Sequence, residues 1–154
     1  MIRIFYLLIF SCSIISCWDL PEFSDSVEID AQGWDKFDKP QFSWDVADAS
    51  MKYDAYFDIR HTGDYQFSNL FLFVDLTYPN GKSRLDTIEC VLANRRGKWH
   101  GTGLGDLLDN RVVYKSEFQF PAKGEYTLSI SQGMRVNPLL WVTDIGFCLE
   151  KTEK

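Results

Sequence analysis

The sequence predicts an all-β protein with one antiparallel domain, either a β-sandwich or a jelly roll. Three observations carry this prediction. Short stretches with a period-two alternation of apolar and polar residues recur from residue 41 onwards, turn residues separate them, and no stretch has the 3.6-residue period of an amphipathic helix. About seven or eight short strands at this spacing are typical of both folds, and periodicity does not choose between them.

The first half of the domain contains three alternating stretches. Residues 42–46 (FSWDV), 54–60 (DAYFDIR) and 69–78 (NLFLFVDLTY) each place apolar side chains on one face. The expected inward positions are Phe42, Trp44, Val46, Ala55, Phe57, Ile59, Leu70, Leu72, Val74 and Leu76. The third stretch is apolar on both faces in its first half, so we expect it to be a central strand.

The second half begins with a predicted turn at residues 78–82 (YPNGK), because Asn and Gly tolerate positive φ. Further strands are expected at 84–92, 112–120, 126–131 and 139–150, with inward side chains at Tyr114, Phe118, Phe120, Tyr126, Leu128 and Ile130. Only 105–110 (GDLLDN) and 133–140 (GMRVNPLL) leave room for a short helical turn.

The first 16 residues have the layout of a secretory signal. Arg3 precedes an apolar run from Ile4 to Ile15, and the small residue Ser16 follows it. As a helix this run would be about 18 Å long, which is too short for a hydrocarbon core of roughly 30 Å. We therefore predict that residues 1–16 are a signal peptide and are removed.

Cys17 is the predicted lipidation site. The sequence Ile14-Ile15-Ser16-Cys17 resembles the bacterial lipoprotein box, in which the cysteine thiol is joined to diacylglycerol and the chain is cut before it. Cys12 is a less suitable lipidation site, because Phe10 and Ser11 precede it. The alternative is an ordinary secretory signal that is cleaved nearby and leaves Cys17 free to form a disulfide. Residues 17–38 are acidic without a clear period, and we expect a lipidated tether that Trp34 and Phe37 hold partly against the domain, which spans 39–154.

Composition excludes some partners. Removing residues 1–16 takes away one charged side chain, Arg3, so the formal net charge changes from −6 to −7. This acidic balance argues against nucleic acid and against a polybasic membrane contact, which leaves the lipid as the membrane anchor. Cys90 and Cys148 are expected on opposite alternation faces, so a disulfide between them is not expected.

No catalytic, metal or cofactor motif stands out. The glycines of GKWHGTGLGD (97–106) match no phosphate-binding pattern, and glycines in a β-protein mark bends or close backbone approaches. His61 and His100 lack partners at metal-ligand spacing, and we expect both on the surface at strand ends. The aspartates of the N-terminal third lack the calcium-loop pattern.

Aromatic residues are abundant, with 5 Trp, 7 Tyr and 12 Phe. Most fall on the inward faces given above, so core packing explains them better than sugar binding, and Trp99 is the least certain. An exposed row of Trp and Tyr on a concave face would favour glycan binding. A flat apolar patch would instead favour a protein partner.

Several stretches occur together in a familiar order: FSNLFLFVDLTYPNGK, DTIECVLA, GKWHGTGLGD, YKSEFQFPAKGEYTLSISQGMR and VTDIGF. From about Tyr53 to Glu150 the chain resembles the GldH family of gliding motility lipoproteins, and the lipoprotein box fits the same family. The resemblance implies an envelope lipoprotein, anchored in the outer membrane and facing the periplasm, with partners in a multiprotein motility and secretion apparatus. It implies no enzyme and no cofactor.

The expected function is therefore a non-enzymatic interaction or structural component of that apparatus, anchored through Cys17. The alternative is a periplasmic glycan- or peptidoglycan-binding module. An enzyme would require His61 or His100 in a pocket beside a carboxylate and a nucleophile.

Overall fold

The structure is a computed structural model that describes residues 20–152. Eight strands account for its regular structure, and no helix occurs within this range. The strands are β1 (Phe23–Glu28), β2 (Gln41–Val46), β3 (Tyr53–Thr62), β4 (Asn69–Thr77), β5 (Ser83–Val91), β6 (Leu107–Phe118), β7 (Gly124–Gln132) and β8 (Val142–Lys151).

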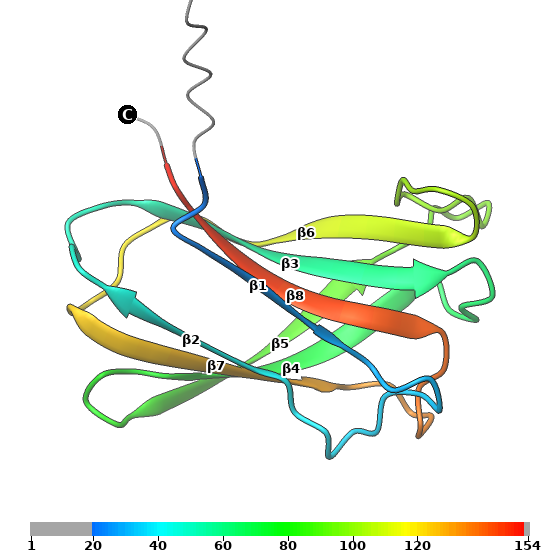
Figure 1. The fold of residues 1–154 in the computed structure, drawn as a ribbon, viewed down its shortest axis with the longest axis horizontal. Helices are drawn as coiled ribbons and strands as arrows, with labels where there is room; N and C mark the ends of the chain where they lie inside the picture. Colours follow the sequence, from blue (N-terminus) through cyan, green and yellow to red (C-terminus); the bar gives the residue numbers. More distant parts are fainter. Residues whose placement is uncertain (1–19, 153–154) are drawn as a thin grey trace, which may run out of the picture.

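The strands form two antiparallel four-stranded sheets that pack face to face (Figure 1). The order is β1-β8-β3-β6 in the first sheet and β2-β7-β4-β5 in the second. Every connection except the β4–β5 hairpin crosses from one sheet to the other. This eight-stranded arrangement is a jelly roll. The predicted all-β class is confirmed, and of the two topologies that periodicity left open the chain adopts the jelly roll.

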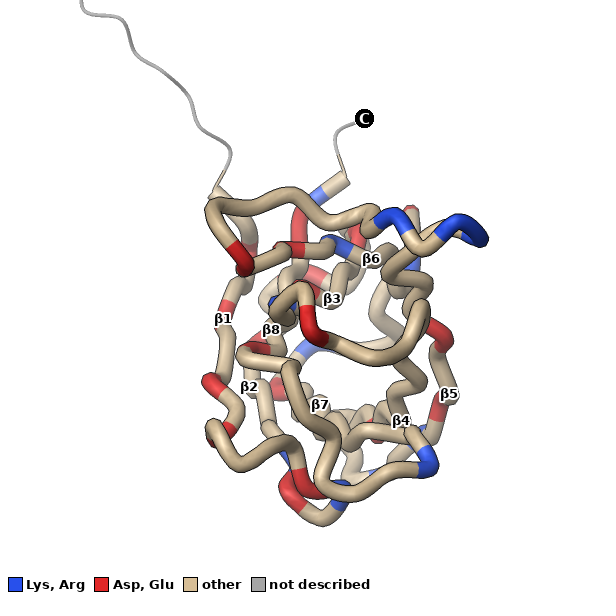
Figure 2. Tube along the Cα trace, turned by 90° about the vertical axis from the view of Figure 1, so that its right-hand side faces the viewer, with Lys and Arg blue, Asp and Glu red and all other residues tan. Residues whose placement is uncertain are grey.

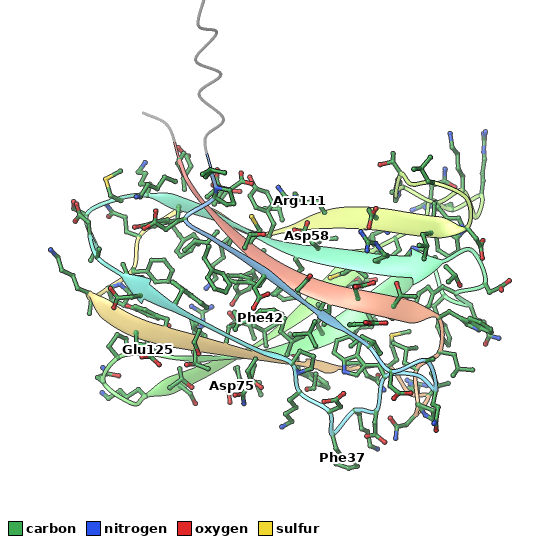
Figure 3. The ribbon with its side chains drawn as sticks, in the orientation of Figure 1. Phe37, Phe42, Asp58, Asp75, Arg111 and Glu125 are labelled. Carbon is green, nitrogen blue, oxygen red and sulfur yellow. The ribbon has the colours of Figure 1, made fainter. Side chains whose placement is uncertain are left out.

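The core between the sheets uses the predicted alternating positions. All ten inward residues expected in the first half are buried, as are Phe120, Tyr126, Leu128 and Ile130. Aromatic rings link the sheets: Phe147 of β8 has its ring centroid 5.0 Å from that of Trp44 and 6.3 Å from that of Phe42, both on β2. Each such pair adds about 0.5–1.5 kcal/mol beyond the area it buries. Phe42 points into this layer in Figure 3.

The segment predicted as a tether is partly folded. Residues 23–28 form β1, which pairs with β8 from Phe23↔Leu149 to Glu28↔Asp144. Phe23 and Val27 pack against the core, whereas Asp25, halfway between them, stays exposed at the sheet edge. That aspartate breaks the apolar alternation, which is why the sequence did not indicate a strand. The jelly roll therefore begins near residue 23, and the expected boundary between residues 38 and 39 is wrong.

Trp34 belongs to the core rather than to the surface of a tether. Its side chain is 0% exposed, its backbone pairs with Leu139, and its Nε1–H donates to the carbonyl oxygen of Asp38 at 2.9 Å. Phe37 behaves differently and is 79% exposed. Of the two aromatic residues expected to lie against the domain, one is completely buried and the other is not.

Residues 105–110, where the sequence left room for a short helical turn, do not form one. Residues 107–110 begin β6 and pair with β3, with Leu107 opposite Thr62 and Asn110 opposite Ile59. The long β3 strand provides backbone partners there, and pairing with it overrides the weak local preference for a turn. At the other end of β6 the register with β3 shifts, and Glu117 has φ of 49°.

Candidate functional site

The two ends of the sandwich carry different features. The proximal end holds the start of the described chain and the loops 47–52, 78–82 and 119–123, and the ion pair between Lys151 and Glu22 (2.6 Å) fixes the chain start against the end of β8. The distal end holds the loops 29–40, 63–68, 92–106 and 133–141 (Figure 1). A chain anchored just before residue 20 would present the distal end away from its anchor.

An apolar patch lies on the distal end. Val136, Leu140 and Trp141 are 41%, 44% and 43% exposed and line one hollow, so they form a group rather than scattered single exposures. They line a small hollow of about 160 Å³ together with Gln66, Phe67 and Pro138. We call these six residues the distal patch. The exposed Phe37 lies on the adjacent loop 29–40 (Figure 3).

Trp141 has a backbone conformation that is unfavourable for its residue type. Its φ is 72°, in the left-handed region where a bulky side chain costs roughly 1–2 kcal/mol. The carbonyl oxygen of Trp141 accepts a hydrogen bond from the backbone N–H of Thr62 at 2.9 Å, which holds this conformation. Strain of this kind concentrates at functional sites. In this case the strained backbone conformation belongs to a tryptophan whose side chain is partly exposed.

Loop 29–40 packs against loop 133–141, which carries most of the distal patch. The backbones of Trp34 and Leu139 exchange two hydrogen bonds, of 2.8 and 2.9 Å, and the N–H of Lys36 donates to Oδ1 of Asn137 at 2.8 Å. Gly33, with φ of 105°, lies so close to Leu140 that an added Cβ would be 2.8 Å from its Cδ2. The distal patch therefore lies on two loops, 29–40 and 133–141, that are joined by hydrogen bonds.

The outer face of sheet β1-β8-β3-β6 carries a second feature, an open polar hollow of about 730 Å³. Arg111 donates to both carboxylate oxygens of Asp58 at 2.8 and 2.9 Å and to Glu150 at 2.8 Å (Figure 3). Arg60 donates to Asp109 at 2.6 Å. Both guanidinium groups are thus engaged by carboxylates. Since these groups are exposed, each ion pair contributes about 1 kcal/mol or less to stability.

His61 is buried, so its expected surface position is wrong. It continues the inward alternation of β3 and is 0% exposed, with its ring centroid 4.6 Å from that of Trp99 and 5.3 Å from that of Tyr65. Nδ1–H donates to the carbonyl oxygen of Thr62 at 2.8 Å, and Nε2 has no partner among the described residues. Burial lowers the pKa of His61, because a proton on Nε2 would place an unpaired charge in the core.

This lowered pKa predicts a loss of stability in mild acid. Below about pH 6.5 the unfolded chain protonates His61 while the folded chain resists, so the free energy of unfolding falls as the pH drops toward the folded pKa. We expect His61→Phe to reduce the stability difference between pH 7.5 and pH 5.5, measured by urea unfolding. The exposed His100 provides the control variant, His100→Gln. An unchanged pH dependence in His61→Phe would contradict the prediction.

His100 is exposed at the rim of the polar hollow, near Thr102 and Asp109. Asp109 is held by Arg60, and none of the hydrogen bonds between described residues joins the His100 ring to a carboxylate or hydroxyl. Burial raises the pKa of the Cys90 thiol to about 12 and also raises that of Cys148, so both thiols stay protonated. Among the described residues, neither histidine is thus brought together with a carboxylate and a nucleophile.

Cys90 and Cys148, the two cysteines within residues 20–152, are free and lie in different places. Cys90 faces the core from the second sheet, whereas Cys148 is on the outer side of the first sheet, between Ser24 and Tyr56 on the neighbouring strands. Within residues 20–152, no three His, Cys, Asp or Glu side chains come together as a metal site. No helix in that range could span a membrane.

The aromatic test separates the two expected functions. Most rings of the described chain are in the core, and on the polar outer face of the first sheet the strands contribute one aromatic side chain, Tyr56, beside Arg111. No exposed row of Trp and Tyr follows a concave face in this part of the chain. The distal patch is an exposed apolar group, although it is hollowed rather than flat.

Comparison with known proteins identifies the family. The profile of the family described as GldH lipoprotein matches residues 22–149. "Gliding motility lipoprotein GldH homolog" of Christiangramia forsetii is 34% identical over 155 residues, covering 96% of this chain and 95% of the relative. "Gliding motility lipoprotein GldH" of Flavobacterium johnsoniae is 31% identical, covering 96% and 92%.

This chain belongs to the GldH lipoprotein family. Membership confirms the resemblance found in the sequence, and makes the chain a gliding motility lipoprotein by family. Cys17 itself lies outside the described residues, so its lipidation and the removal of residues 1–16 stay predictions.

Solved structures resemble this GldH family member only distantly. A family GH115 4-O-methyl-alpha-glucuronidase has a TM-score of 0.40 at 13% identity; the match covers 83% of this chain and 14% of the enzyme. The infectious bursal disease virus VP2 subviral particle has a TM-score of 0.35 at 15% identity, with 83% and 30% covered. Likenesses at these TM-scores say nothing about what the GldH family member does.

Proposed function

We propose that this GldH family member is a non-enzymatic docking protein of the cell envelope. In this proposal, lipid on Cys17 anchors it in the outer membrane facing the periplasm. Its distal end then binds a protein of the motility apparatus. The observation that carries the proposal is the distal patch, with its exposed and conformationally strained Trp141, at the end opposite the start of the described chain.

The chemistry of the patch supports a protein partner. Tryptophan is enriched among the few residues that dominate binding energy at protein interfaces. Trp141 lines a hollow with Leu140 and Val136, so a partner side chain could displace water from three apolar surfaces at once. Because the supporting loops are ordered before binding, little conformational entropy would be lost on docking.

The variant Trp141→Gly separates docking from folding. Glycine adopts a φ of 72° without strain, so we expect the free energy of unfolding to stay within about 1 kcal/mol of the unmodified protein. Docking should weaken by about 30-fold, which corresponds to the loss of a 2 kcal/mol interface residue. The measurement is chemical crosslinking of the full-length protein in native membranes, followed by identification and quantification of the attached proteins.

Leu85→Ala is the matched control, because Leu85 is 68% exposed on β5, outside the distal patch. It should leave the crosslinked complexes unchanged. If Trp141→Gly keeps its crosslinked partners, or if both variants lose them equally, the distal patch is not the docking site.

A further inference from the structure

Two of the four distal loops are basic, whereas the other two, 29–40 and 63–68, together contain four Asp and two Lys. Arg95, Arg96 and Lys98 lie in loop 92–106, and Arg135 precedes Val136 in loop 133–141. Those two loops contain four basic residues and a single acidic one in a chain whose net charge is −6. The acidic one, Asp106, already accepts a hydrogen bond from the backbone N–H of Gly63. The two loops are thus basic in an acidic protein.

Residues 94–98, which we call the basic turn, are held in a defined conformation by hydrogen bonds. Asn94 organises it: its N–H donates to the carbonyl oxygen of Lys98 at 2.9 Å, and its Oδ1 accepts from the N–H groups of Arg96 (2.8 Å) and Lys98 (3.1 Å). Gly97, with φ of 77°, allows the tight reversal. Figure 2, which looks onto the distal end, shows this turn as the blue segment projecting at the upper right.

These basic side chains play no visible part in folding. Six other Lys and Arg residues of the described chain form ion pairs with carboxylates: Lys52, Arg60, Arg84, Arg111, Lys115 and Lys151. The four on the distal loops form no ion pair within residues 20–152, and the three of the turn are exposed. Their charge is therefore available to something outside the domain.

The distal loops are continuous with one another. The N–H of Gly63 contacts Asp106 of loop 92–106, and the N–H of Thr62, one residue before it, donates to Trp141. Residues 62 and 63 thus contact both loop 92–106, which carries the basic turn, and loop 133–141, which carries the distal patch, and both loops are on the same end of the domain (Figure 1). Apolar anchors with charged groups at their margin are the usual anatomy of a protein interface.

We propose that the partner docks an acidic segment across this end, with carboxylates facing the basic turn and Arg135 and an apolar side chain in the hollow of the distal patch. This inference rests on the docking function proposed above and specifies the chemistry of the partner. Charges at an interface margin speed association and select partners, and salt screens them. A lipid surface could match the charge, but the hollow favours an inserted side chain.

The test places a photo-crosslinking residue on the distal patch by the substitution Leu140→p-benzoylphenylalanine, in the full-length protein in its native membranes. The charge-reversed variant is Arg95→Glu/Arg96→Glu/Lys98→Glu. The matched control is Lys82→Glu/Lys123→Glu, which reverses two exposed lysines on the proximal loops. Mass spectrometry maps the crosslinked segment, and the yield is compared at low and high salt.

We expect the crosslinked segment to contain an excess of Asp and Glu. The yield should fall about tenfold in the charge-reversed variant and change little in the control, and added salt should affect the unmodified protein most. A neutral or basic segment, or an unchanged yield after charge reversal, would overturn the acidic partner while leaving the docking function standing. Crosslinks to lipid alone would overturn a protein as the occupant. If position 140 crosslinks to nothing, the docking function itself fails.

Discussion

Replacing Trp34 with alanine is expected to lower the free energy of unfolding by about 3–5 kcal/mol, the usual cost of truncating a buried tryptophan. The side chain is 0% exposed, and its Nε1–H holds the carbonyl oxygen of Asp38, which would lose that partner. Since a domain of this size is stable by about 5–15 kcal/mol, the variant should retain only part of its stability. Urea unfolding followed by circular dichroism measures the change without relying on tryptophan fluorescence.

The same loop provides the control. Phe37, three residues away, is 79% exposed, so Phe37→Ala should change the unfolding free energy by roughly 0.5 kcal/mol or less. If Trp34→Ala were as mild as Phe37→Ala, loop 29–40 would behave as a surface tether after all. We also expect Trp34→Ala to weaken docking, because Trp34 pairs with Leu139 directly beside the distal patch.

Local alternation predicted most of the fold because both sheets bury one face only. In β3 and β7 every second residue enters the core, so the two-residue period is visible in the sequence itself. Choosing a jelly roll over other sandwiches depends on which strands pair across long separations, such as β1 with β8. The apolar pattern of a strand contains no information about that choice.

The two errors at β1 and at His61 have different physical causes. β1 is an edge strand, where solvent reaches the inward-side position of Asp25 and permits a charge in an apolar series. His61 was the opposite case. It continues the buried series of Ala55, Phe57 and Ile59 in β3, and that series was the available sign that the histidine is inside. For this residue, position in the alternation is a better guide to burial than residue type.

The candidate site was not predictable in the same way. The distal patch joins Phe67 from one loop with residues 136–141 from another, and loops have no period that would reveal which side chains meet. The positive φ of Trp141 also leaves no mark in the sequence, since glycine is the residue expected there. What the sequence could indicate was the location of the protein, through the residues around Cys17.

Replacing Cys17 with alanine is expected to release the protein from the membrane fraction and to abolish labelling by a fatty-acid probe. Each acyl chain contributes about 0.8 kcal/mol per buried CH₂, and several chains on one residue hold a protein very stably. The measurement is labelling with an alkyne fatty acid together with fractionation of the full-length protein.

Cys12→Ala is the matched control, because Cys12 lies in the same apolar run but follows Phe10 and Ser11 rather than a lipoprotein box. This variant should remain labelled and bound to the membrane. Continued labelling of Cys17→Ala, or loss of labelling in Cys12→Ala, would assign the lipid to another residue. The Cys17→Ala variant also tests docking. Without the lipid anchor, the distal end is no longer held facing away from a membrane. Crosslinks from position 140 should therefore decrease, although the distal patch itself is unchanged.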